Sequence, residues 1–189
     1  MFGARRKRLP RRLVSLLRLL IAVLSTAGAP HSGVLAAHKV IAPEDGYLVR
    51  QIRVYRRRTW RWKRVMGRQP TSSAASELDP SHAYRRWVRA LWRRRATLAG
   101  RRATNPPHKR EWLCIHSHEG AWDDPDPTYY GGLQMDIEFQ REWAPRLLAR
   151  KGTADHWTPL EQMWVAERAY RSGLGFTPWP NTARMCELL

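Results

Sequence analysis

The sequence predicts a mainly α-helical protein in three parts: an N-terminal signal or membrane anchor, a basic region with helical segments, and a small C-terminal domain. Apolar residues recur three and four positions apart in several segments, which is the spacing of an amphipathic helix, and strand-like alternation is scarce. The charge also changes sign along the chain. Of the 34 Lys and Arg residues, 27 precede Cys114, whereas 11 of the 16 acidic residues lie from Cys114 onward. We place the domain boundaries after residues 37 and 110.

The first 37 residues have the pattern of an export signal. A basic segment that ends at Arg12 is followed by an apolar stretch over residues 13 to 29, which only Arg18 interrupts. Small residues at 27 to 29 or at 35 to 37 offer cleavage sites. An uncleaved membrane anchor is the alternative, and the short apolar stretch favours a signal. We therefore expect an exported protein.

Residues 38 to 110 are expected to be basic and partly helical. A helix is predicted over residues 47 to 66, a loop over 67 to 81, and a second helix from near Ser81. The apolar positions at helical spacing are Leu48, Ile52 and Tyr55 in the first helix and Tyr84, Trp87, Val88, Leu91 and Trp92 in the second. Arginines occupy the remaining faces, so this region is expected to attract a polyanion: nucleic acid, anionic lipid or an anionic cell wall.

The C-terminal domain is predicted from residue 111, after a Gly- and Pro-containing boundary at residues 100 to 109. A helix over residues 111 to 118 is expected to end at Gly120 in a left-handed cap, before a loop over 122 to 132. Asp136 is expected to cap the next helix, which Pro145 ends or bends. Thr158-Pro159-Leu160-Glu161 has the capping-box pattern of a helix start, and Gly173 closes that helix.

Cys114 and Cys186 are the two cysteines of the chain. An even number of cysteines in an exported protein favours a disulfide, with two unpaired thiols as the alternative. In the chain-entropy model, closing so long a loop stabilises the folded state by roughly 4 kcal/mol. Because a small domain has little core, this bond is expected to matter for its stability.

Glu119 is the carboxylate with the most distinctive position. We expect it at the C-terminal end of a helix, where the helix dipole disfavours a negative charge, beside the aromatic residues Trp122 and Tyr129. Both effects favour the protonated carboxyl that a general acid requires. Position alone fits an ordinary solvated glutamate better than a general acid.

Two stretches of the C-terminal domain form a longer motif. They are Cys114-Ile115-His116-Ser117-His118-Glu119-Gly120-Ala121-Trp122 and Tyr129-Tyr130-Gly131-Gly132-Leu133-Gln134, and Trp179-Pro180 and Cys186 follow near the end. Together they resemble the transglycosylase-like domain of actinobacterial resuscitation-promoting factors, and nothing before Trp112 takes part. Four residues separate Cys114 from Glu119, where that family commonly has none, and the Ser-Gly-Gly that often follows Glu is shortened to Gly120-Ala121.

The resemblance implies a reduced lysozyme-like fold and cleavage of the β-1,4 bond between N-acetylmuramic acid and N-acetylglucosamine. It implies Glu119 as the catalytic residue. The residues expected to contact the glycan are Trp122, Tyr129, Tyr130, Gly132, Gln134 and Trp179. No cofactor is expected, and hydrolysis or formation of an anhydro product both fit.

Other titratable residues near Glu119 are expected to be structural. Most glycosidases use a second carboxylate, for which Asp123, Asp124, Asp126 and Asp136 are the candidates. Asp124 and Asp126 fit a rigid turn and Asp136 a helix cap, and the resemblance implies a scheme with a single catalytic carboxylate. His116 and His118 point about 200° apart on a helix, so no metal site is expected. A tuning effect of His118 on Glu119 remains a hypothesis.

The sequence thus predicts a secreted or cell-wall-associated enzyme of peptidoglycan remodelling, held on the anionic wall or membrane surface by its basic region. A cell-wall peptidase is an additional candidate partner. A glycan-binding protein without turnover is the first alternative, because the turn after Glu119 is shortened. A nucleic-acid-binding protein is the second alternative, although the sequence shows no helix-turn-helix or zinc module and attraction to phosphates alone is unspecific.

Overall fold

The computed structural model describes residues 42–72 and 81–189, all within one unit that begins at residue 40. The mainly α-helical prediction is confirmed, since the described residues form helices and turns and contain no strand. The predicted signal or anchor at residues 1–37 lies outside the described residues. Within the described ranges, no helix combines the length and the apolar character needed to cross a bilayer.

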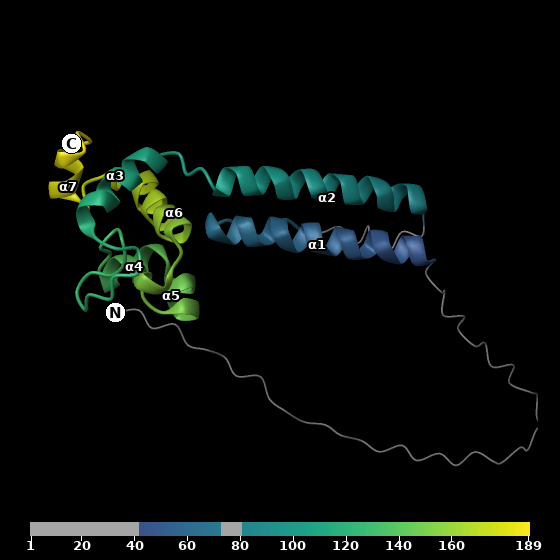
Figure 1. Ribbon diagram of the computed structural model, residues 1–189, viewed down its shortest axis with the longest axis horizontal. Helices are drawn as coiled ribbons and strands as arrows, with labels where there is room; N and C mark the ends of the chain where they lie inside the picture. Colours follow the sequence, from purple (N-terminus) through teal and green to yellow (C-terminus); the bar gives the residue numbers. More distant parts are fainter. Residues whose placement is uncertain (1–41, 73–80) are drawn as a thin grey trace, which may run out of the picture. The chain divides into compact units, whose positions relative to one another are not determined.

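Helices α1 (Pro43–Val65) and α2 (His82–Ala103) form an antiparallel hairpin (Figure 1). Helix α1 begins earlier than predicted because Pro43 is suited to the first helical position. The predicted start of a helix near Ser81 is confirmed, and the Ser81 hydroxyl caps it by accepting a hydrogen bond from the Tyr84 amide at 3.3 Å. Helix α2 continues through Gly100, which the sequence placed in the boundary. A Cβ atom at Gly100 would lie 3.1 Å from Nε1 of Trp62, so the glycine lets the two helices approach closely.

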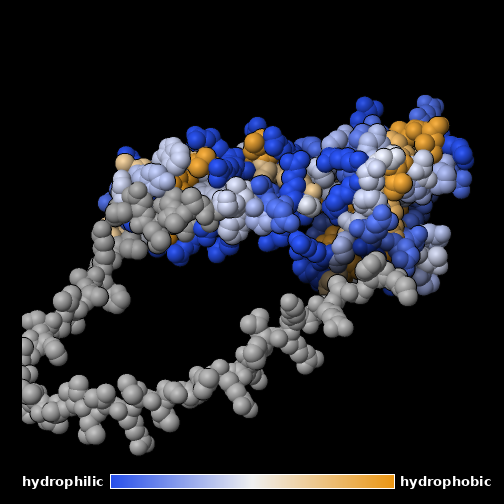
Figure 2. Space-filling view, turned by 180° about the vertical axis from the view of Figure 1, so that it is seen from behind, coloured by the Kyte–Doolittle hydropathy of each residue, from blue (hydrophilic) through white to orange (hydrophobic). Residues whose placement is uncertain are grey.

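The hairpin has a small core. Ile52, Val88 and Trp92 are its buried members, and the Trp60 ring meets the Trp92 ring edge to face. Most arginines of both helices remain exposed. Figure 2 accordingly shows hydrophilic side chains over most of the visible face, with small hydrophobic patches between them.

The C-terminal domain is built from short helices. They are α3 (Lys109–Glu119), α4 (Ile137–Trp143), α5 (Pro145–Lys151), the 3-10 turn η2 (Ala154–His156), α6 (Pro159–Ala169), the π turn η3 (Tyr170–Leu174) and α7 (Pro180–Met185). The helix caps predicted at Asp136 and Thr158 are both present. Helices α5 and α7 were not predicted, because each has only two turns or fewer and no sustained apolar period.

The end of α3 differs from the prediction. Gly120 has φ 164° and ψ −172°, which is extended backbone and not a left-handed cap. Its lack of a side chain matters for space instead. A Cβ atom there would lie 3.0 Å from Oδ2 of Asp124 and 3.2 Å from Nε2 of Gln134. The chain therefore leaves α3 against the loop that carries these two polar side chains.

An aromatic core holds the C-terminal domain together around α6. Trp112 of α3 is fully buried, and its ring packs against Phe176 and Trp179 with centroids 4.9 and 5.1 Å away. Its indole N–H donates to the buried Glu167 of α6 at 3.0 Å. The core thus fixes the axis of α3, and with it the position of Glu119 at its end.

The hairpin is joined to the domain through a second cluster. Met66, Ala103 and Trp164 are buried together. The Trp164 indole N–H donates to the Ala103 carbonyl at 2.8 Å, which satisfies one carbonyl at the end of α2.

Candidate active site

Glu119 is the last residue of α3 and is partly buried. The hydroxyl of Thr182 donates a 2.7 Å hydrogen bond to its Oε1 atom. Among the described residues, no side chain hydrogen-bonds Oε2. One carboxylate oxygen is therefore held, while the other remains available for a proton or a ligand.

Helix α7 fixes this arrangement twice. Thr182 contacts Glu119, and Cys186, one helical turn later, forms a disulfide with Cys114 of α3. The predicted pairing of the two cysteines is thus confirmed, with their Cα atoms 6.0 Å apart. Because both contacts link the same two helices, the disulfide also keeps the Thr182 hydroxyl beside the Glu119 carboxylate.

The loop facing the end of α3 closes on itself at Tyr130 and Met135. Each of these residues donates its amide to the carbonyl of the other, at 3.1 and 3.0 Å. Gly131, inside this loop, has φ +71°, and a Cβ atom there would lie 2.7 Å from the side-chain amide of Gln162. Glycine is required there both for its backbone conformation and for space.

Gly132 allows a second close approach. Its carbonyl oxygen lies 3.0 Å from Nδ1 of His116, and a Cβ atom would lie 2.6 Å from the same nitrogen. The His116 ring stacks on Trp122, with centroids 3.9 Å apart. This carbonyl and one face of the Trp122 ring are therefore engaged within the protein, which limits what Gly132 can offer to a glycan.

Gln134 lies beside the end of α3. Its Nε2 atom donates to Oδ2 of Asp124 at 3.1 Å and to the Gly131 carbonyl at 3.0 Å. Because Gly120 touches both side chains, the residue after Glu119 is packed against this pair. The structure thus brings Gln134 close to the residue that follows Glu119, and its predicted contact with a glycan stays a prediction.

The three remaining aromatic candidates have different environments. Tyr129 is 49% exposed, so its ring is available to a ligand. Tyr130 is partly buried, and its hydroxyl donates to the Pro127 carbonyl. Trp179 is 5% exposed, packs on Trp112 and Phe139, and donates its indole N–H to the Leu133 carbonyl at 2.6 Å. Its predicted role in stacking on a sugar is therefore corrected to a role in the core.

Three of the neighbouring carboxylates have structural partners, whereas Asp123 is exposed and has no side-chain hydrogen bond or ion pair among the described residues. Asp126 accepts from the amides of Thr128 and Tyr129, and these two hydrogen bonds hold the pKa of its carboxyl below the ordinary value. Asp136 caps α4, and Asp124 is bonded to Gln134. Each of these side chains occupies the structural role expected from the sequence.

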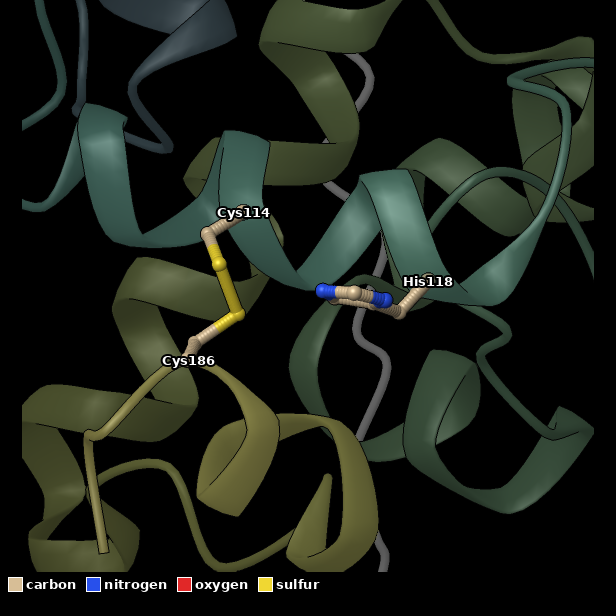
Figure 3. Close-up of side chains that lie close together, drawn as sticks. All are labelled: Cys114, His118 and Cys186. Atoms are coloured by element: carbon tan, nitrogen blue, oxygen red, sulfur yellow. A yellow bond between two sulfur atoms is a disulfide. The ribbon is translucent and has the colours of Figure 1, made fainter.

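The described residues contain one group of three possible metal ligands. Ligand atoms of Cys114, His118 and Cys186 lie within 4.8 Å of one another, and Figure 3 shows the His118 ring beside the two sulfurs. The sulfurs are bonded to each other, so neither is a thiolate. A zinc site needs three or four ligands, and the oxidised pair leaves only the imidazole.

Three positioning residues escaped the sequence analysis. Thr182 could have been identified from its spacing, because it precedes Cys186 by four residues and so lies on the same helix face as the disulfide. Gln162 is fully buried and donates to the carbonyls of Trp122 and Ala154, which fixes the start of the loop. Glu167 accepts from the amide of His108 and from Trp112, which anchors the start of α3. Buried polar residues of this kind do not stand out in a single sequence.

Comparison of the chain with protein-family models, with curated proteins and with solved structures found no match.

Proposed function

We propose that the protein is a secreted enzyme that cleaves the β-1,4 bond between N-acetylmuramic acid and N-acetylglucosamine in peptidoglycan. In this proposal the C-terminal domain has a reduced lysozyme-like fold, and Glu119 is the catalytic residue. The observation that carries the proposal is the placement of Glu119. It ends a helix that is pinned by a disulfide, one oxygen is held by Thr182, and the facing loop presents Gln134 and the exposed Tyr129.

The chemistry requires one carboxyl group. Glu119, protonated, donates its proton to the glycosidic oxygen as the bond to the muramic acid C1 breaks. The resulting carboxylate then takes the proton of the muramic acid C6 hydroxyl, whose oxygen closes onto C1 and gives a 1,6-anhydro end. If water attacks C1 instead, Glu119 takes the water proton, and the product is a reducing end. Either route returns Glu119 to its protonated form.

A single-carboxylate scheme agrees with the surroundings of Glu119. A second catalytic carboxylate needs oxygen atoms that are free to act on a water molecule or on the sugar near the scissile bond. Asp124, Asp126 and Asp136 are instead bonded to a side-chain amide or to backbone amides. These three residues are therefore assigned to the support of the loop and of α4, and the exposed Asp123 is the one candidate for a second carboxylate without such a bond.

The helical hairpin is the proposed attachment surface. Helices α1 and α2 together contain sixteen basic and two acidic residues. Charges of one sign at this density attract polyanions over several ångströms, and the attraction weakens with salt. The proposed partners are the anionic cell wall or an anionic membrane surface.

The test is to incubate the purified chain with cell-wall sacculi and to analyse the soluble products by mass for anhydro-muropeptides. Glu119→Gln should reduce product formation by about 100-fold or more, the usual range for a general acid. Glu142→Gln is the matched control, because Glu142 is an exposed residue of α4. Thr182→Val should lower the turnover number while leaving sacculus binding intact, and Thr182→Ser should restore it.

Three outcomes separate the candidates. Products that disappear only with Glu119→Gln support the enzyme. Sedimentation with sacculi without any products supports a glycan-binding protein and contradicts catalysis. Salt-sensitive DNA binding, with neither products nor sedimentation, supports a nucleic-acid-binding protein.

A further inference from the structure

A cavity of about 460 Å³ lies away from the proposed catalytic residue. Its walls come from the end of α1 and the segment after it, from the junction of α4 and α5, and from α6. This volume falls within the range of small-molecule binding sites. None of the predicted glycan-contacting residues lines it.

The lining of this cavity is strongly basic. Its arginines are Arg64, Arg68, Arg146, Arg150 and Arg168. Glu161 is the one carboxylate among the described residues that line it, and it is already bonded to Lys151 at 2.6 Å. No ion pair within the described ranges joins Arg64, Arg68 or Arg146 to an acidic residue. The positive charge around the cavity is therefore largely uncompensated.

Arg168 supplies a partly buried guanidinium at this site. Its Nε atom donates to the Trp143 carbonyl at 2.7 Å and its Nη1 to the Trp164 carbonyl at 3.1 Å. Burial lowers the pKa of Arg168 to about 10, so the group stays cationic at neutral pH. Its neighbours hold it in place without neutralising its charge, which is the arrangement expected of a residue that meets an anion.

The remaining walls are apolar. Trp143, Pro145 and Leu147 line the cavity beside the arginines. Guanidinium groups bind phosphate and carboxylate oxygens through paired hydrogen bonds. Several uncompensated guanidinium groups favour a ligand with more than one negative charge, and a phosphate group carries about −1.5 to −2 at neutral pH when it is a monoester.

We propose that this cavity is a second binding site, specific for a phosphate-bearing ligand, with Arg64, Arg68, Arg146 and Arg168 contacting the phosphate and Trp143 contacting the apolar part. The site is independent of glycan cleavage. It differs from the diffuse charge of the hairpin, because it is concave and has the partly buried guanidinium of Arg168 at its wall.

Calorimetric titration of the purified full chain with inorganic pyrophosphate, at constant ionic strength, tests this proposal. The double variant Arg68→Ala/Arg146→Ala should weaken pyrophosphate binding by about tenfold or more, since each charge-assisted hydrogen bond is worth at least that much. Arg57→Ala/Arg58→Ala removes the same charge from exposed positions of α1 outside the cavity and should change the dissociation constant less than about threefold. Both chosen pairs are exposed, so the fold should be retained, which circular dichroism checks.

Two arms identify the source of the phosphate. Vesicles of phosphatidylglycerol compared with phosphatidylcholine test a lipid headgroup, and pyrophosphate tests a soluble phosphate. Cavity-dependent binding in either arm supports the site. The proposal is overturned if both double variants weaken binding equally or if neither arm shows binding. It is also overturned if citrate, titrated as a carboxylate comparison, binds more tightly than pyrophosphate.

Discussion

The helical hairpin and the C-terminal domain are stabilised in different ways. In the hairpin, a few buried residues such as Ile52 and Trp92 hold together two helices whose exposed faces are mostly arginine. In the C-terminal domain, a continuous aromatic core surrounds Trp112, and a disulfide ties α3 to α7. The comparison teaches that the region with the continuous core and the covalent cross-link is also the region that contains Glu119, the proposed catalytic residue.

The difference also concerns electrostatics. Like charges along α1 and α2 repel one another, and one of the few compensating contacts is Asp45, which bonds Arg85 at 2.6 Å and His82 at 2.8 Å. The hydrogen bond from His82 and the contact with Arg85 hold the pKa of Asp45 below its ordinary value. Salt or a bound polyanion screens the repulsion, so the hairpin is expected to gain stability from conditions that leave the C-terminal domain unchanged.

The largest expected effect is the loss of the central indole of the C-terminal domain. Trp112→Ala should destabilise the protein by about 3–5 kcal/mol, because it removes a fully buried ring and leaves Glu167 short of a donor. Denaturant unfolding followed by tryptophan fluorescence and circular dichroism measures this. Trp87→Ala is the control, since Trp87 is 53% exposed and its loss should change stability by less than about 0.5 kcal/mol. Similar losses in the two variants would contradict the contrast between the regions.

Removal of the disulfide should have the next largest effect. Replacing Cys114 and Cys186 with Ser should cost about 2–4 kcal/mol. Hydrogen exchange should become faster in α3 and α7, where the Thr182 contact to Glu119 is also loosened, and should stay unchanged in the hairpin. Faster exchange in α1 and α2 would show that the two regions unfold as a single unit.

A smaller effect is expected where the hairpin meets the domain. Gly67 has φ +69°, and a Cβ atom there would lie 2.6 Å from Nη1 of Arg168. Gly67→Ala should therefore cost about 1–2 kcal/mol from backbone strain, and it should displace Arg168 from the basic cavity. Gly46→Ala, in the first turn of α1, is the matched control and should not reduce stability, because a Cβ atom there would meet only Arg50, at 3.5 Å. Thermal unfolding of both variants provides the measurement.

The smallest expected effect depends on pH. Burial alone would raise the pKa of Glu161, but Lys151 and Thr158 outweigh it and hold the pKa below 4.5. Stabilisation from this group is therefore present above pH 4.5 and is lost as the pH falls through the folded-state pKa. Glu161→Gln should cost about 1 kcal/mol at neutral pH and nothing in strong acid. Urea unfolding at several pH values would contradict this if the difference between the two proteins did not shrink on acidification.

Much of the local structure was predictable because its signals are local. The caps at Ser81, Asp136 and Thr158 each depend on a residue within three positions, and all three are present. The end of α3 was predicted at the right place but with the wrong conformation. Gly120 is extended because it meets Asp124 and Gln134, which is a contact between segments and not a property of the helix end.

The candidate site was predictable in part for the same reason. Gln134 lies beside Gly120, the residue after Glu119, whereas Trp179 is buried in the core. An aromatic residue at a chain end gives no sign of which side packs inward, since core packing and ligand stacking use the same flat apolar ring.

The sequence by itself determined most of the helices (but not α5 and α7), the reversal of charge between the two halves, the cysteine pair and Glu119 as the carboxylate of interest. These follow from residue spacing, residue counts and a contiguous motif. Only the tertiary structure decided that Thr182 hydrogen-bonds Glu119, that Gln162 bonds the Trp122 carbonyl and that Glu167 bonds Trp112 of α3. It also decided that five arginines from three separate segments line one cavity. The physical reason is that these contacts join residues distant in the chain, and their partners are set by packing and by the need to satisfy buried polar groups.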